Sequence, residues 1–324
     1  MENSLKSFNK ADKDLLKSIE RVIKDGVLSK SPRTKWKDGE PANYKSVKGE
    51  FYRYNLEAGE YPINTLRKTA LKGAFHDIEA IYIKQTNIIE EMHPSIHSWW
   101  EDFVVKTFSP KELSDKWVEW AYHCGDESKY GDKKPIDFQE RSIGKTYGHT
   151  VKRYDLMNKL LRGMETNPES RRHIINLWQE QQMIDDPKAL VPCAFLTNWG
   201  VDLGEDENRV TLQLTQRSQD KLMTSSINPI EYIFLGLMVC NHLTFKTGKV
   251  HKLVDFMHSV FDVHIYDRHF LMAEYLLTKE GNGKNPRVFL NCPPKDFYEH
   301  TWEDFSFEGL EDIEPLPFKL ELAI

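Results

Sequence analysis

The sequence is poor in cysteine, has no long hydrophobic run and carries no excess of positive charge. Its four cysteines are scattered over 324 residues, which excludes a disulfide framework, and no Cys-x-x-Cys pair indicates a zinc site. No stretch of about 18 apolar residues is present that would span a membrane. The 44 basic and 50 acidic residues give a net charge of −6, which argues against a nucleic-acid-binding protein. We expect a cytoplasmic protein without a metal, a membrane contact or a nucleic-acid partner.

Hydrophobic spacing predicts a mixture of helices and strands within one domain, residues 1–324. Segment 229–246 is apolar on nearly all sides, which is typical of a buried helix. A hairpin around the turn 204–208 is expected to pack on this helix, because apolar and polar residues alternate on its second arm. The predicted helices are 15–23, 71–82, 154–161 and 229–246, and the predicted hairpin arms are 193–199 and 209–218. This pattern predicts an α+β fold.

Cys193 stands in an apolar run at the start of a predicted strand, and two basic turns lie near it in the sequence. An isolated cysteine in such a run is often structural, but positive charge nearby would make it a candidate thiolate nucleophile. Arg171 and Arg172 follow a predicted turn, and Arg217 and Ser218 end a predicted strand. Guanidinium groups and a hydroxyl match the oxygens of a phosphate dianion. Each run alone is often a solvated turn; together they indicate an anion site beside a nucleophile.

The segment from Asp262 to Tyr266 is a further candidate for ligand binding. Period-two spacing puts His264 and Tyr266 on one side of a predicted strand. Both side chains can donate and accept hydrogen bonds, so they could hold the hydroxyls of a sugar. A histidine and a tyrosine that simply belong to the core are the alternative.

These motifs occur in the order and approximate spacing of the thymidylate synthase family, which the chain resembles over most of its length. The resemblance implies a single α+β domain in which helices cover a mixed sheet, and a homodimer that forms through the sheet. The similar segments are GKTYG (144–148), NPESRR (167–172), PC (192–193), QLTQRSQD (213–220) and DVHIY (262–266), together with Asn228, WVEWA (117–121) and the tail 302–324.

The family chemistry that this resemblance implies is a folate-dependent transfer of one carbon to dUMP. The Cys193 thiolate would add to carbon 6 of uracil, and carbon 5 would attack the methylene of 5,10-methylenetetrahydrofolate. Asn228 can donate to a carbonyl and accept from a ring N–H, which suits uracil rather than cytosine. The implied catalytic residues are Cys193, Asp77, Tyr147 and Asp220. The residues implied to bind the nucleotide are Arg33, Arg171, Arg172, Gln216, Arg217, Ser218, Asn228, His264 and Tyr266. The residues implied to contact the folate are Trp117, Leu190, Asp220 and Ile324.

Arg171 and Arg172 are implied to reach the active site of the partner subunit, which would make each site a product of two chains. The sequence also departs from the family pattern near the base. Ala194 follows the nucleophile where the family has a histidine, and the family's helical glutamate aligns with Asp77. Glu79 competes for that role, because both carboxylates lie at the edges of the apolar stripe.

The chain also contains extra sequence. An insertion spans about 88–116, includes Ile96, Trp99, Trp100 and Phe103, and is expected to form a helix. A loop-rich segment follows at about 121–143.

The departures near the base bear on the product of the reaction. Hydride from the folate gives a methyl group, whereas water gives a hydroxymethyl group. Bacteriophage hydroxymethylases of the family also lack the histidine after the cysteine, and their Tyr-x-Arg-His-Phe segment is similar to residues 266–270. We therefore expect a deoxyuridylate 5-hydroxymethylase, in the host cytoplasm if the source is a phage. The alternative is a thymidylate synthase that makes dTMP, and a remote one is an inactive dimer that binds nucleotide or RNA.

Overall fold

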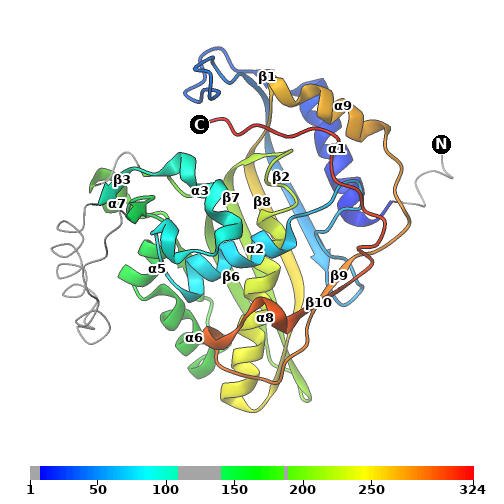
Figure 1. Cartoon of the computed structure of the whole chain (residues 1–324). Coiled ribbons are helices and arrows are strands. Elements are labelled where there is room, and N and C mark those ends of the chain that lie inside the picture. Colours follow the sequence, from blue (N-terminus) through cyan, green and yellow to red (C-terminus); the bar gives the residue numbers. More distant parts are fainter. Residues whose placement is uncertain (1–7, 109–139, 186–188) are drawn as a thin grey trace.

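The structure, a computed structural model, describes residues 8–108, 140–185 and 189–324 (Figure 1). Its α-helices are α1 (Lys10–Asp25), α2 (Leu71–Ile78), α3 (His97–Trp100), α5 (Gly148–Arg153), α6 (Leu156–Thr166), α7 (Glu180–Asp185), α8 (Asn228–Thr247) and α9 (Phe270–Thr278). Its strands are β1 (Val27–Leu28), β2 (Tyr44–Asn55), β3 (Lys106–Phe108), β4 (Glu140–Ser142), β5 (Ile174–Asn176), β6 (Ala194–Asp202), β7 (Glu207–Asp220), β8 (Val250–Tyr266), β9 (Arg287–Leu290) and β10 (Phe305–Glu308).

The main sheet has six strands in the order β1-β2-β8-β7-β6-β5. Strands β7 and β8 are parallel, and the other neighbouring pairs are antiparallel. The long α8 connects the parallel pair, because parallel strands need a crossover rather than a tight turn. Two smaller sheets pair β9 with β10 and β3 with β4. The mixed sheet with its helices confirms the α+β fold class.

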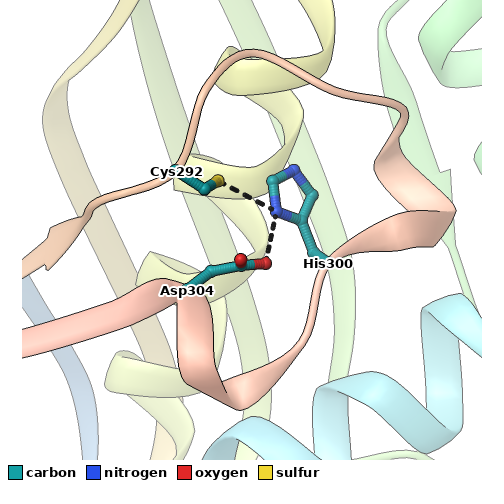
Figure 2. A group of neighbouring side chains, drawn as sticks. All are labelled: Cys292, His300 and Asp304. Atoms are coloured by element: carbon teal, nitrogen blue, oxygen red, sulfur yellow. Dashed lines mark hydrogen bonds and ion pairs between the residues drawn. The ribbon is translucent and has the colours of Figure 1, made fainter.

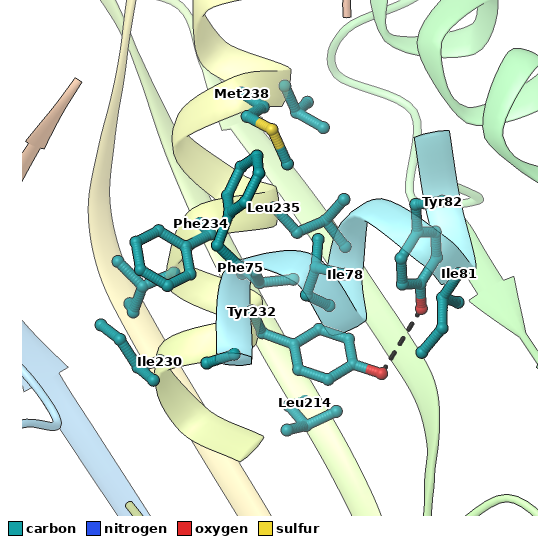
Figure 3. Packing of buried hydrophobic residues seen from close by; sticks show 14 of the residues in the cluster. Phe75, Ile78, Ile81, Tyr82, Leu214, Ile230, Tyr232, Phe234, Leu235 and Met238 are labelled. Carbon is teal, nitrogen blue, oxygen red and sulfur yellow. Dashed lines mark hydrogen bonds between the residues drawn. The ribbon is translucent and has the colours of Figure 1, made fainter. Parts of the chain in front are cut away.

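Helix α8 packs on β7 and β8, and α2 crosses over α8 (Figure 3). Gly236 allows the close approach of α8 to the sheet, because a Cβ there would lie 2.6 Å from a methyl carbon of Leu253. Phe75 of α2 meets Phe234 of α8 edge to face, with ring centroids 5.9 Å apart. Burial of these large side chains supplies the main driving force for the layer. As predicted, residues 229–246 form a buried helix and 193–218 a hairpin beneath it.

Three predicted segments differ in detail from the structure. The helix predicted at 71–82 ends as α2 at Ile78 and continues as a π-helix, Glu79–Ile83. The helix predicted at 154–161 starts at Leu156, because Asp155 takes a left-handed conformation with φ of 51°. The first part of the insertion forms α3 and short 3₁₀ turns between Ile89 and Phe103 rather than one helix. The insertion then continues into β3, and its residues 109–116, like most of segment 121–143, lie outside the described residues.

The sheet face turned away from α8 carries side chains of mixed polarity. Val210, Leu212 and Leu214 of β7 point to α8, so the residues between them point to the opposite face. Phe51 and Phe261 are 58% and 67% exposed on the neighbouring strands, and the register places both on that opposite face. Among the described residues, no helix has the length and apolar character needed to cross a membrane.

Candidate active site

Cys193 lies between Pro192 and the first residue of β6, where its sulfur meets the end of β7. The Arg217 guanidinium is 3.4 Å from Cys193 Sγ, and Ser218 Oγ is 3.7 Å from it. Arg217 also donates to the carbonyls of Pro192 at 2.9 Å and Val191 at 2.7 Å. The guanidinium therefore fixes the loop that carries the cysteine and directs N–H groups at the sulfur. Such donors stabilise negative charge on a thiolate.

Tyr147 links the cysteine to the helical side of the site. Its hydroxyl accepts a hydrogen bond from the Cys193 backbone N–H at 3.2 Å. Burial, and then the neighbouring Cys193, raise the pKa of Tyr147 well above its usual value, so the phenol keeps its proton. Tyr147 has a φ of 45°, an uncommon backbone conformation for a residue with a side chain. Such conformations persist only where the surroundings impose them, which is common at functional sites.

Asn228 begins α8 and is held by hydrogen bonds at both ends of its amide. Its Oδ1 accepts from Gln216 Nε2 at 2.9 Å, and its Nδ2 donates to Glu231 Oε2 at 3.1 Å. Gln216 is held in turn by His258, whose Nε2 lies 2.9 Å from Gln216 Oε1. Burial lowers the pKa of His258 to about 3, so its imidazole is neutral and can donate from Nε2. The Asn228 amide thus has one fixed orientation.

Asp77 lies on α2, is buried, and accepts a hydrogen bond from Trp100 Nε1 at 2.7 Å. Burial raises the pKa of Asp77 to about 7, against the opposing effect of hydrogen bonds from Trp100 and Glu231. Glu79, the competing carboxylate, instead pairs with His76 at 3.0 Å and Lys84 at 3.4 Å. The geometry therefore favours Asp77 over Glu79 as the carboxylate at the base end of the site.

His264 and Tyr266 alternate along β8 with Val263 and Ile265, which pack against α1. The two polar rings therefore point to the other side of the strand, with centroids 5.1 Å apart. Burial, and a weaker effect of Cys193, raise the pKa of Tyr266 to about 12. Tyr266 is therefore within electrostatic reach of the cysteine, and the His264 ring lies beside the Tyr266 ring.

Of the residues implied to contact the folate, the structure describes Ile324 of the C-terminal tail, Asp220 and Leu190. Ile324 exchanges backbone hydrogen bonds with Lys35 at 2.7 and 2.8 Å, close in sequence to the exposed Arg33. Asp220 accepts from the N–H groups of residues 222 and 223 through one oxygen, which leaves its second oxygen near His269 at 3.9 Å. The Leu190 carbonyl accepts from Thr146, beside Tyr147. Trp117 lies outside the described residues.

Arg171 and Arg172 are both exposed in the turn after α6. Within the described part of this chain, neither side chain forms a hydrogen bond with Cys193, in contrast to Arg217. Their exposure is what the implied contact with a partner subunit requires.

Sequence reasoning missed two residues that contact the site, Glu231 and Trp100. Glu231 is the one acidic residue in the predicted helix 229–246, and a buried charge of this kind needs a partner. A single acidic residue in a helix predicted to be buried could therefore have identified Glu231 from the sequence. Nothing in the sequence distinguishes Trp100 from Trp99, because only the fold of the insertion decides which indole reaches Asp77.

A separate cluster of ligand-type side chains, Cys292, His300 and Asp304, lies between β9 and β10 (Figure 2). Cys292 Sγ is 3.9 Å and Asp304 Oδ2 is 3.2 Å from His300 Nδ1. Asp304 also pairs with Lys295 at 2.7 Å and accepts from the Thr301 N–H at 2.9 Å. These bonds show that Asp304 caps a 3₁₀ turn and that Lys295 neutralises its charge. The cluster therefore gives no indication of a second reaction centre.

Comparison with known proteins places the chain in a family. The family model described as thymidylate synthase matches residues 13–322. The thymidylate synthases of Streptococcus pneumoniae and Streptococcus thermophilus are 36% and 34% identical over 320 residues, which cover 98% of this chain and 100% of each relative. The solved structure of thermostable thymidylate synthase A from Bacillus subtilis has the same fold, with a TM-score of 0.71 and 24% identity over 97% of this chain and 99% of that one. The chain belongs to the thymidylate synthase family.

Proposed function

We propose that the protein is a thymidylate synthase that transfers the methylene carbon of 5,10-methylenetetrahydrofolate to carbon 5 of dUMP. The observation that carries this proposal is the position of Cys193 Sγ beside Arg217 and Ser218. One-carbon transfer to dUMP with this folate as co-substrate is the chemistry of the family. Hydride from the folate would reduce the transferred carbon, so the products would be dTMP and dihydrofolate.

Cys193 is the proposed nucleophile. Its thiolate would add to carbon 6 of uracil, which makes carbon 5 nucleophilic toward the methylene carbon. Arg217 and Ser218 would bind the phosphate next to the sulfur, together with Arg33. In this arrangement the substrate's phosphate and the thiolate would share one guanidinium, so nucleotide binding and the cysteine's position are coupled.

The remaining residues would orient the base, the sugar and the folate. Asn228 presents a donor and an acceptor to the uracil edge, and Gln216 holds it there. His264 and Tyr266 would bind the sugar. Tyr147 and Asp77 would complete the polar surroundings of the base. For the folate, the proposed contacts are Asp220, Leu190, Ile324 and Trp117.

We further propose that the protein is a homodimer that forms through the sheet. The face opposite α8 exposes Phe51 and Phe261, whose apolar area would be covered by a second sheet. Arg171 and Arg172 would then supply cations to the phosphate site of the partner subunit. A two-fold axis makes this exchange reciprocal, so each dimer would have two shared sites.

A hydroxymethylase is the second candidate, and Ala194 and Asp77 favour it. Both residues differ from the family pattern at the base side, where water would have to replace hydride as the reactant. The bacterial relatives described above are all named thymidylate synthases, so they favour the methyl product and give no support to a bacteriophage source. An inactive binding protein is disfavoured by the arginine contacts of Cys193.

The product decides between these candidates. Purified protein is incubated with dUMP and 5,10-methylenetetrahydrofolate, and product mass and dihydrofolate are measured. We expect dTMP and dihydrofolate in equal amounts, and no turnover by Cys193→Ser, which should still bind dUMP. Formation of 5-hydroxymethyl-dUMP without dihydrofolate would identify a hydroxymethylase. Binding of dUMP without any turnover of the wild-type protein would rule out both enzymes.

A further inference from the structure

Glu231 is a buried carboxyl group that the reaction outlined above does not use. It lies in the first turn of the otherwise apolar α8 and is 4% exposed. Asp77, which is 6% exposed, faces it from α2 within hydrogen-bonding reach. Two carboxylates cannot both be charged at such close range in a buried site, so the pair holds one proton.

The surrounding hydrogen bonds indicate where that proton resides. Asp77 accepts from Trp100, a donor that stabilises a charged carboxylate. Glu231 Oε2 accepts from Asn228, and a proton on the other oxygen of Glu231 can be donated to Asp77. Burial, and then the charge of Asp77, raise the pKa of Glu231 well above its usual value. Asp77 is therefore the carboxylate and Glu231 the acid.

The same bonds extend to the residue that would contact the base. His258 fixes Gln216, Gln216 donates to Asn228, and Asn228 donates to Glu231. Rotation of the Asn228 amide would direct its N–H₂ group at the Gln216 donor and its oxygen at the Glu231 oxygen. Both bonds would be lost, so the chain of donors opposes the orientation that would suit a cytosine ring.

We propose that Glu231 is a positioning residue that holds the Asn228 amide in the uracil-binding orientation and shares one proton with Asp77 at the base end of the site. The inference rests on the proposed function, since it assigns a base to Asn228. The other titratable groups that face the pair are the phenols of Tyr82, Tyr147 and Tyr232, from the π-helix, the start of α5 and α8. Burial raises the pKa of each phenol, so all three stay neutral.

Two substitutions separate the two roles of Glu231. Glu231→Gln can still accept from Asn228 and donate to Asp77, but it removes the shared proton. Glu231→Met has similar volume and removes both hydrogen bonds. Tyr82→Phe is the control, because it deletes a neighbouring hydroxyl whose hydrogen bond is with Tyr232 and not with Glu231 or Asp77. Near-ultraviolet circular dichroism of each variant establishes that it is folded.

For Glu231→Gln we measure the pH profile of tritium release from carbon 5 of labelled dUMP, a step shared by both candidate products. In wild type the acid limb should reflect the Asp77 pKa of about 7. The proton that Glu231 donates to Asp77 lowers the Asp77 pKa, and the amide of a glutamine is a weaker donor, so in Glu231→Gln that limb should move up by about one pH unit. If the acid limb of the pH profile stays in place or moves down in Glu231→Gln, Glu231 and Asp77 do not share a proton.

For Glu231→Met we measure binding of dUMP and dCMP by calorimetry. The preference for dUMP should fall by roughly tenfold, the loss of about one hydrogen bond, whereas Glu231→Gln and Tyr82→Phe should keep it. An unchanged preference in Glu231→Met would overturn the positioning role. A wild-type protein that binds dUMP and releases no tritium would instead contradict the proposed function, and the binding comparison would still test Glu231.

Discussion

At the scale of single residues, Arg217 contacts the Cys193 sulfur and the loop that precedes it. Arg217→Lys keeps the charge but loses the planar group that reaches Val191, Pro192 and Sγ at once. We expect the KM for dUMP to rise roughly 10- to 100-fold, since a hydrogen bond to a charged group contributes about 1.5–3 kcal/mol. Steady-state kinetics with varied dUMP measure this change.

Arg209→Lys is the matched control for that substitution. Arg209 lies on the same strand, β7, but its side chain is exposed and pairs with Glu57. Exposed ion pairs contribute little, so the KM for dUMP should not change. Equal values of KM in wild type and Arg217→Lys would show that a single positive charge is sufficient at this position.

Some site residues could be predicted from the sequence because they lie on regular elements. Strand alternation put His264 and Tyr266 on one side of β8, and Arg217 at the end of β7 faces the cysteine loop. Glu231 and Trp100 reach Asp77 from α8 and the insertion. Such contacts depend on how distant segments pack, and no local period of the sequence encodes them.

At the scale of elements, the segment from Leu71 to Ile83 shows the limit of hydrophobic spacing. The apolar stripe predicted one helix, whereas the structure changes from α to π after Ile78. A π-turn inserts an extra residue into the repeat, so side chains after it turn to a different direction. The spacing of apolar residues in the sequence does not reveal the change from α-helix to π-helix, because both kinds of helix can cover the same core.

The insertion packs on α2 through Trp99, and Gly73 makes room for the indole. A Cβ at Gly73 would lie 2.6 Å from Cζ2 of the Trp99 ring. Gly73→Ala should therefore displace Trp99 and destabilise the fold by roughly 1–3 kcal/mol, as measured by denaturant unfolding. Because Trp100 is the next residue, the hydrogen bond to Asp77 should weaken and turnover should fall.

Lys72→Ala is the control for this element, since Lys72 is exposed on the same helix. Its effect on unfolding should be small. The double variant Gly73→Ala/Trp99→Leu should recover part of the loss, because a smaller side chain removes the overlap. If Gly73→Ala matched wild type in both stability and turnover, the insertion would have no role in placing Trp100.

At the scale of the whole molecule, the distribution of charge fits the proposed site shared between two subunits. The chain is acidic overall, with a net charge of −6, yet it exposes Arg33, Arg171 and Arg172, the arginines proposed to bind phosphate together with Arg217. Arg217 is half-buried beside the sulfur, whereas Arg171 and Arg172 extend from the turn after α6. If the latter two act on the partner subunit, a site depends on residues from both chains.

This dependence predicts that two inactive variants restore each other. Cys193→Ser lacks the nucleophile, and the double variant Arg171→Ala/Arg172→Ala lacks the cations for the partner's phosphate site. In a mixed dimer, one site would combine the intact cysteine of one subunit with the intact arginines of the other. Random reassociation makes half of the dimers mixed, each with one complete site, so roughly a quarter of wild-type activity should return.

The measurement is the rate of dTMP formation after the two variants are mixed, unfolded and refolded together. Each variant refolded alone is the control and should show little activity. Phe261→Lys, introduced into both variants, places a charge on the exposed sheet face and should prevent both dimer formation and recovery, as followed by light scattering. Recovery that persists in monomers, or its absence in confirmed mixed dimers, would contradict a site that Arg171 and Arg172 complete across the sheet interface.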